Sequence, residues 1–188
     1  RIVNYIDKEI MKGDIAEAKL FNPDFIIANM HWGLEYERIP SREQRELADW
    51  LLRQGVDLVI GSHPHVVQPM ELRRGKEGVT DRLVVYSLGN FISNMSREHT
   101  DGGVMVKVVL GRKGLRRYII SAQYSLIYSS RYKNEQGKED IRVVPAASWS
   151  GKNQNSSFSV DSALIKYVNN TRLFLKGNNK EVEEYIFE

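Results

Sequence analysis

The chain has 188 residues and contains no cysteine, which excludes disulfides, thiolate metal ligands and cysteine nucleophiles. No hydrophobic run reaches the length of a membrane-spanning helix, and no signal-peptide pattern is present. The Walker phosphate-binding loop and the G-x-G-x-x-G dinucleotide fingerprint are also missing. No serine has an evident base partner, so a serine triad is not expected.

The chain also has no large excess of positive or negative charge. The 27 basic and 24 acidic residues leave a net charge of +3, and the basic residues are scattered, so nucleic acid is not expected as a partner. With 41% hydrophobic and 27% charged residues, the composition is that of an ordinary globular domain. The chain begins with Arg1 inside a helical pattern. We therefore expect it to belong to a longer protein, with any export signal or membrane anchor outside this sequence.

A strand–helix–strand unit is predicted in the first third of the chain. Apolar runs at residues 25–28 and 58–60 are each typical of a buried strand. Between them, Ser41 and Gln44 form a capping box at the start of a helix, and Gly55 is placed to end it. Strands joined in this way run parallel with a right-handed crossover.

The other elements are expected from apolar periodicity and turn residues. A helix is predicted over residues 2–12, with a core-facing stripe of Ile2, Tyr5, Ile6 and Ile10. Antiparallel strands are predicted at residues 82–87, 103–110, 115–128 and 142–145, with a hairpin turn at 111–114 and a polar loop at 129–140. A polar linker at 151–157 precedes two C-terminal helices, one starting near Asp161 and carrying Leu164, Ile165 and Val168, the other at 180–186.

Three of the four histidines are predicted to meet at one edge of the sheet. His31 follows the first strand of the parallel unit, and His63 and His65 follow the second. Pro64 fixes its own φ and favours an extended conformation for His63. Ligands of open α/β sheets bind outside the carboxyl ends of strands, so the three imidazoles predict a metal site there. Two alternatives stay open: a hydrogen-bonded His31 beside Trp32, and a rigid turn with exposed imidazoles at 63–65.

Other polar residues near these strand ends are candidates for the same site. Glu35 follows His31 and is a ligand, an orienting group, a general base or a solvated carboxylate. Asn90 follows a third strand and contacts a metal or phosphate oxygen, or serves as a turn residue. His99 and Asp101 lie in a polar loop that is either solvated or folded over the site. Ligands of this kind suit divalent Zn, Mn or Fe, and hydrolysis is the expected reaction class.

Three motifs in this order resemble bacterial capsule-synthesis proteins of the CapA type, which are linked to poly-γ-glutamate synthesis and export. They are H-W-G-L-E-Y (31–36), G-S-H-P-H-V-V-Q (61–68) and S-L-G-N-F (87–91). The resemblance is clear from about Asp24 to Gly103. It implies an α/β fold of the calcineurin-like metallophosphoesterase type, a four-layered α/β/β/α sandwich. Residues 1–150 would form the C-terminal part of that domain, and residues 151–188 a polar linker with C-terminal helices.

The resemblance also implies site residues and a setting. His31, His63 and His65 would bind divalent metal ions, and His31, Glu35 and Asn90 are the catalytic candidates. The family's early G-D and N-L-E motifs have no counterpart here, so we expect either a missing N-terminal half or a second copy to cover the exposed apolar face. The expected substrate is a small molecule or a polymer, at the cell surface, with the full-length protein membrane-associated. The alternative is a non-catalytic scaffold or polymer-handling component of capsule assembly.

Overall fold

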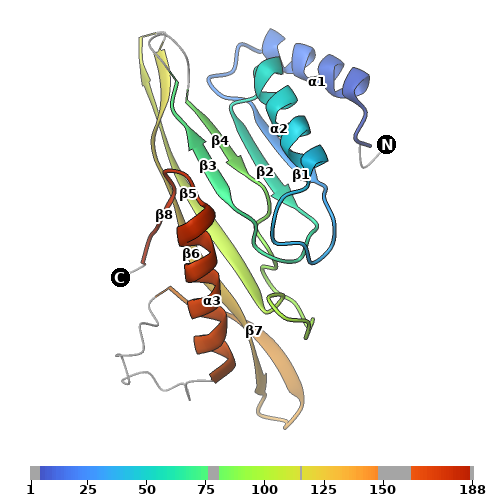
Figure 1. The fold of residues 1–188 in the computed structure, drawn as a ribbon, viewed down its shortest axis with the longest axis vertical. Helices are drawn as coiled ribbons and strands as arrows, with labels where there is room; N and C mark the ends of the chain where they lie inside the picture. The colour runs from blue at the N-terminus through green and yellow to red at the C-terminus, as the bar shows by residue number, and fades with distance from the viewer. Residues whose placement is uncertain (1–4, 76–80, 115, 148–161, 187–188) are drawn as a thin grey trace.

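The computed structural model describes residues 5–75, 81–114, 116–147 and 162–186 (Figure 1). Within these ranges a short, mostly parallel sheet and a long antiparallel sheet pack against each other, and helices cover them. The elements in chain order are α1 (Lys8–Leu20), β1 (Ile27–His31), α2 (Arg42–Gln54), β2 (Leu58–Ser62), β3 (Met70–Arg73), β4 (Arg82–Val85), β5 (Gly102–Lys113), β6 (Arg116–Lys133), β7 (Glu139–Pro145), α3 (Ser162–Asn178) and β8 (Glu183–Glu184).

The first sheet has the strand order β1-β2-β4-β3. β1, β2 and β4 run parallel, so the antiparallel direction predicted for the strand at 82–87 is wrong relative to β2; β3 is antiparallel to β4. The register of β1 on β2 places His31 opposite Ser62, so both strands end at the same edge. The predicted parallel strand–helix–strand unit and the α/β class are therefore confirmed. The buried strand predicted at 25–28 is wrong in position and burial, because β1 begins at Ile27 and only Met30 in it is buried.

The ends of helix α2 are set by its capping residues. The Ser41 hydroxyl accepts a hydrogen bond from the Gln44 backbone N–H, and the Gln44 side chain accepts one from the Ser41 N–H. Gly55 ends the helix in the left-handed region at φ 98°, where glycine pays no steric penalty. The predicted capping box and stop are confirmed; of the apolar stripe expected from Leu47, Trp50 and Leu51, the two leucines are buried and Trp50 is partly buried.

The predicted N-terminal helix is displaced along the chain. Asp7 caps α1 by accepting from the N–H groups of Glu9 and Ile10, so the helix begins at Lys8 rather than at residue 2. The predicted stripe is wrong for its described members, because Tyr5, Ile6 and Ile10 are exposed. Ile15 is the buried residue of this helix, and Ile2 lies outside the described residues.

The second sheet is built on a long hairpin of β5 and β6, with β7 beside β6. The predicted turn at 111–114 is largely strand, because β5 continues to Lys113 and pairs there with Arg116. The predicted loop at 129–140 is mostly strand as well: backbone pairing carries β6 to Lys133 and starts β7 at Glu139. A register shift between Val109 and Leu110 changes which residues of β6 face inward.

The C-terminal prediction is partly wrong. A helix is present as α3, although Ile165 is exposed and Asp161 lies outside the described residues. The helix predicted at 180–186 is absent there; instead β8 pairs in parallel with β6. Tertiary hydrogen bonds fix this tail in an extended form, since the Lys180 N–H donates to the Met70 carbonyl at 2.9 Å.

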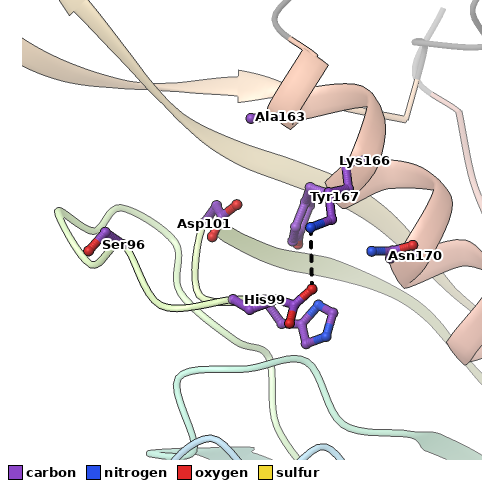
Figure 2. Close-up of a pocket in the computed structure, with 8 residues that line it drawn as sticks. Ser96, His99, Asp101, Ala163, Lys166, Tyr167 and Asn170 are labelled. Carbon is purple, nitrogen blue, oxygen red and sulfur yellow. Dashed lines mark ion pairs between the residues drawn. The ribbon is translucent and has the colours of Figure 1, made fainter.

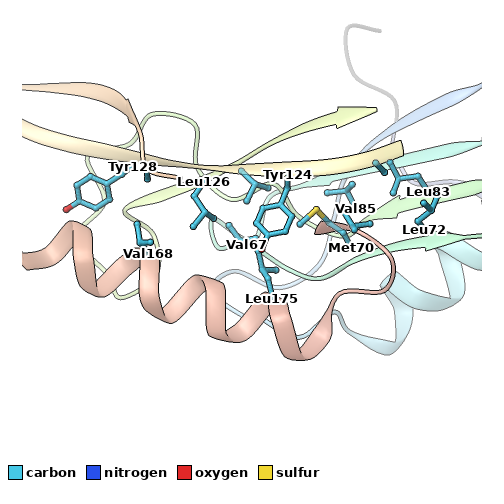
Figure 3. Close-up of a cluster of buried hydrophobic side chains, with 14 of the residues drawn as sticks. Val67, Met70, Leu72, Leu83, Val85, Tyr124, Leu126, Tyr128, Val168 and Leu175 are labelled. Atoms are coloured by element: carbon cyan, nitrogen blue, oxygen red, sulfur yellow. The ribbon is translucent and has the colours of Figure 1, made fainter. Parts of the chain in front are cut away.

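Two apolar layers hold the fold together. One lies between the first sheet and the helices α1 and α2, and includes Ile15, Leu47, Leu51, Val59 and Val84. The other lies between the two sheets and is closed along one side by α3 (Figure 3). Its members include Met70, Leu83, Leu126, Val168 and Leu175. This layering is consistent with part of a metallophosphoesterase-like sandwich.

A buried carboxylate joins the two sheets at one end. Asp81 accepts hydrogen bonds from the backbone N–H groups of Gly75 at 2.9 Å and Ile119 at 3.1 Å, and from the Arg74 guanidinium at 3.0 Å. Burial by itself would raise the pKa of Asp81, but these donors outweigh it and the pKa lies below its ordinary value. The ionised form is therefore the one that stabilises the fold.

We expect Asp81→Asn to lower the free energy of unfolding by about 1–3 kcal/mol near neutral pH, because buried N–H donors lose a charged acceptor. A lowered folded-state pKa gives stability that is present above the unfolded value of about 3.9 and is lost as pH falls through the folded value. The difference between wild type and variant should therefore shrink below about pH 4 in urea titrations. Asp24→Asn is the control, because its ion pair with Arg112 is exposed. A pH-independent difference would contradict this assignment.

Candidate functional site

Three imidazoles converge at the carboxyl ends of β1 and β2. His31 is the last residue of β1, and His63 follows directly after β2. The ring centroids of His31 and His63 are 4.6 Å apart, and those of His63 and His65 are 6.2 Å apart. The prediction that parallel strands bring these residues to one edge is confirmed. We call His31, His63 and His65 the histidine rim.

The backbone of the rim differs from the extended conformation predicted around Pro64. His63 has φ 104° and His65 has φ 61°, both in the left-handed region. Such conformations cost non-glycine residues roughly 1–3 kcal/mol and persist only where the surroundings fix them. Here the chain must reverse at once to bury Val66 and Val67, which are 0% and 3% exposed. Burial of the two valines overrides the local preference set by proline.

A close approach of three strands fixes where the rim begins. The indole N–H of Trp32 donates to the Tyr86 carbonyl at 2.8 Å, and the path of this bond runs over Gly61. A Cβ atom at Gly61 would lie 2.0 Å from that carbonyl oxygen and 2.5 Å from the indole nitrogen. Only glycine fits between them. Trp32 of the H-W-G motif and Gly61 of the G-S-H motif therefore pack against each other.

Asn90 orients one imidazole of the rim. Its side-chain NH₂ donates to the Thr100 carbonyl at 2.9 Å, so its amide oxygen faces His65 Nδ1 at 3.0 Å. An oxygen acceptor requires the hydrogen on Nδ1, which leaves the Nε2 lone pair of the neutral ring free. The structure thus gives Asn90 an orienting contact, whereas the sequence predicts contact with metal or phosphate.

Two residues that sequence reasoning missed extend the rim. The Tyr36 ring stacks near His65 with centroids 6.1 Å apart, and the Arg97 guanidinium carbon lies 3.9 Å from the Tyr36 ring centroid. The Tyr36 backbone N–H also donates to the Pro64 carbonyl at 2.7 Å, which ties its loop to the histidine turn. Tyr36 belongs to the H-W-G-L-E-Y motif and was visible there. Arg97 comes from a distant segment and has no sequence signal.

Glu35 lies in an exposed position beside Tyr36. Burial first, and then a hydrogen bond with the Glu35 carboxylate, raise the pKa of Tyr36. Glu35 therefore lies next to the extended rim. Its predicted role as a ligand or general base stays a prediction.

The donor set of the rim fits part of a metal centre. Two neighbouring imidazoles and a third with a free Nε2 are suitable nitrogen donors. Within the ranges that the structure describes, however, no group of three or more histidine, aspartate or glutamate side chains is arranged to hold a metal ion. The described residues therefore fit the histidine share of such a site, and a complete site needs further ligands.

A hollow of about 390 Å³ lies between the loop at 96–101 and α3 (Figure 2). His99 and Asp101 face Tyr167 across it, and Lys166 pairs with Glu98 at 3.5 Å. Burial, and then the positive charge of Arg38, lower the pKa of His99, while burial raises the pKa of Asp101. These two residues are half-buried beside α3. The loop nevertheless reaches the rim through Arg97.

Comparison with known proteins decides the family. The family model described as "Bacterial capsule synthesis protein PGA_cap" matches residues 2–95, half of the chain. The chain belongs to this family. It is 34% identical over 115 residues to the PGA biosynthesis protein CapA of Bacillus subtilis (strain 168), and 35% identical over 107 residues to the capsule biosynthesis protein CapA of Bacillus anthracis. The resemblance to CapA-type proteins is confirmed.

These alignments also place the chain within its relatives. They cover 61% and 57% of this chain, but 28% and 24% of the two CapA proteins. The PGA_cap chain thus spans about a quarter of the length of the curated relatives it matches. The match includes β1, β2 and β4, with all three residues of the histidine rim.

We expect Gly61→Ala to lower the free energy of unfolding by about 1–3 kcal/mol, because the added methyl group meets a backbone oxygen that cannot move alone. Separation of β2 from β4 should also displace His63 from His31. Urea unfolding and the NMR signals of the imidazole Cε1 protons report these two effects. Gly13→Ala is the matched control, because nothing lies within 4 Å of its added Cβ and alanine favours a helix. A Gly61→Ala protein with wild-type stability would show that the close approach is not required.

Proposed function

We propose that this chain supplies the histidine-bearing part of a metal-dependent hydrolase site in a CapA-type protein of capsule or poly-γ-glutamate biosynthesis. The observation that carries the proposal is the convergence of His31 and His63, with His65 next to them and its Nε2 lone pair free. The names of the two relatives, a PGA and a capsule biosynthesis protein, support the biological setting.

In this proposal His31, His63 and His65 would supply nitrogen ligands to a divalent metal ion that further ligands complete, and Mn, Zn and Fe are the candidates. Such an ion would lower the pKa of bound water and stabilise charge on a phosphoryl or related oxygen. The chain's own residues prepare the donors: Asn90 holds the Nδ1 hydrogen of His65, and the Trp32–Tyr86 bond fixes the strand end from which His63 leaves. The remaining ligands would come from outside the described residues.

A second function is favoured by a specific observation. The G-D and N-L-E motifs that supply acidic and amide ligands in the resembled fold have no counterpart in this sequence, which favours a non-catalytic scaffold or polymer-handling component. In that case the rim binds the substrate polymer without cleaving it. Both functions place the protein in capsule assembly, and we propose a cell-surface location for either one. Across the described ranges, no helix combines the length and apolarity that crossing a bilayer requires.

We expect the His63→Ala, His65→Ala double variant to lose most of the bound divalent metal, with affinity reduced by about 100-fold or more, because two nitrogen donors are removed. Asn90→Ala should reduce it by about 10–100-fold through loss of the oriented His65 tautomer. Metal content after dialysis against Mn²⁺ or Zn²⁺ measures both effects. His99→Ala is the control, because the fourth histidine lies in the hollow beside α3. Equal metal content in all four proteins would overturn the metal site.

Turnover separates the hydrolase from the scaffold. A screen of phosphomonoesters and phosphodiesters with added Mn²⁺ should give activity that His31→Ala reduces by about 100-fold or more, and that His99→Ala leaves unchanged. Activity that is equal in wild type and His31→Ala would come from elsewhere. No turnover by a protein that binds metal through the rim would favour the polymer-handling function.

A further inference from the structure

Tyr36 and Arg97 continue the line of the histidine rim. Arg97 lies over the Tyr36 ring, Tyr36 stacks near His65, and His65 is followed by His63 and His31. The hydrogen bond from the Tyr36 N–H to the Pro64 carbonyl holds this platform on the same turn as the imidazoles. A guanidinium is therefore fixed at one end of the rim, although its residue comes from a different loop.

The charge of Arg97 is available to a ligand. The side chain is exposed, and within the described ranges it has no carboxylate in ion-pair contact. Arg131, by contrast, donates to the carbonyl groups of Asn94 and Met95. Arg74 pairs with Asp81 and Glu181. Contact with an aromatic face orients a guanidinium and leaves its N–H donors free around its edge.

We propose that Arg97, held on Tyr36, forms an oxyanion subsite beside the histidine rim. Its ligand is a carboxylate or phosphoryl group of an extended anionic substrate, because the planar N–H fork of arginine matches both groups. The proposal names the substrate class of the site and rests on the proposed function for the position of the reacting group. A row of ring contacts from His31 to Arg97 suits a ligand with charges along its length better than a single small ion.

Substitution of Glu35 should change the affinity for an anion in the opposite direction to substitution of Arg97. Glu35 is exposed and precedes Tyr36 in the chain, so it places a negative charge near the platform that carries Arg97. An anionic ligand at Arg97 is repelled by this charge. Glu35→Gln therefore strengthens binding of an anion, whereas removal of Arg97 weakens it. A cationic or neutral ligand would not show this pair of opposite effects.

The experiment measures binding to the purified protein in EDTA, so that metal plays no part. The probes are a fluorescent γ-linked oligoglutamate and inorganic phosphate. Arg97→Ala should weaken binding by about 10- to 100-fold, the value of a hydrogen bond to a charged group, and Arg97→Lys should give an intermediate loss. Tyr36→Phe should bind as wild type, because the ring remains, and Tyr36→Leu should bind as weakly as Arg97→Ala. Arg53→Ala, which removes an exposed arginine from α2, is the matched control.

The outcomes are distinct. If oligoglutamate binding alone depends on Arg97, the subsite takes polymer carboxylates; if phosphate binding alone depends on it, the subsite takes a phosphoryl group. Equal affinities in wild type, Arg97→Ala and Arg53→Ala overturn the subsite, as does a wild type that binds neither probe. Urea unfolding confirms that each variant is folded. Because this assay contains no metal, loss of the metal site in the histidine variants leaves its result unchanged, and the two proposals fail separately.

Discussion

The hydrogen bond from the Trp32 indole to the Tyr86 carbonyl is the contact on which the site depends. It crosses Gly61 and joins the ends of β1, β2 and β4, whose parallel register already sets His31 opposite Ser62. Because Trp32 is 4% exposed, this bond forms away from water, and breaking it would leave a buried donor and acceptor unpaired. The strand ends are therefore held in place, and they set the distance between the imidazoles that follow them.

Local sequence signals predicted the parts of this arrangement that local physics determines. The ends of α2 are set by local features: the hydrogen bonds between Ser41 and Gln44 at its start, and the left-handed backbone of Gly55 at its end. Parallel strand polarity then follows from the connection, and so does the meeting of His31 with His63. The conformation at His63 was not predictable in this way. The rule for residues before proline is a steric preference, and burial of the following valines outweighs it.

The elements that were misassigned are those whose stability comes from distant partners. Residues 129–133 have no apolar alternation in the sequence and become strand because β7 pairs with them along the whole stretch. Glu183 and Glu184 are extended because Gln123 and Tyr124 are beside them. Arg97 reaches Tyr36 through the fold, and no spacing in the sequence encodes that contact. Sequence patterns report periodicity and caps, whereas strand pairing and cation–π contacts depend on the assembled sheets.

The surroundings of His31 support the proposed ligand-binding role of the rim. A structural histidine is normally buried and uses its ring nitrogens in hydrogen bonds. His31 is exposed, the neighbouring indole donates to Tyr86, and within the described residues the ring of His31 has His63 as its aromatic neighbour and no hydrogen-bond partner. At the other end of the row, Arg97 lies over the Tyr36 ring. Within the described residues, Arg97 forms no ion pair. Nitrogen groups that the fold positions without giving them a partner are suited to a bound metal or anion. The alternative of a hydrogen-bonded His31 beside Trp32 accounts neither for the exposed ring of His31 nor for the position of Arg97.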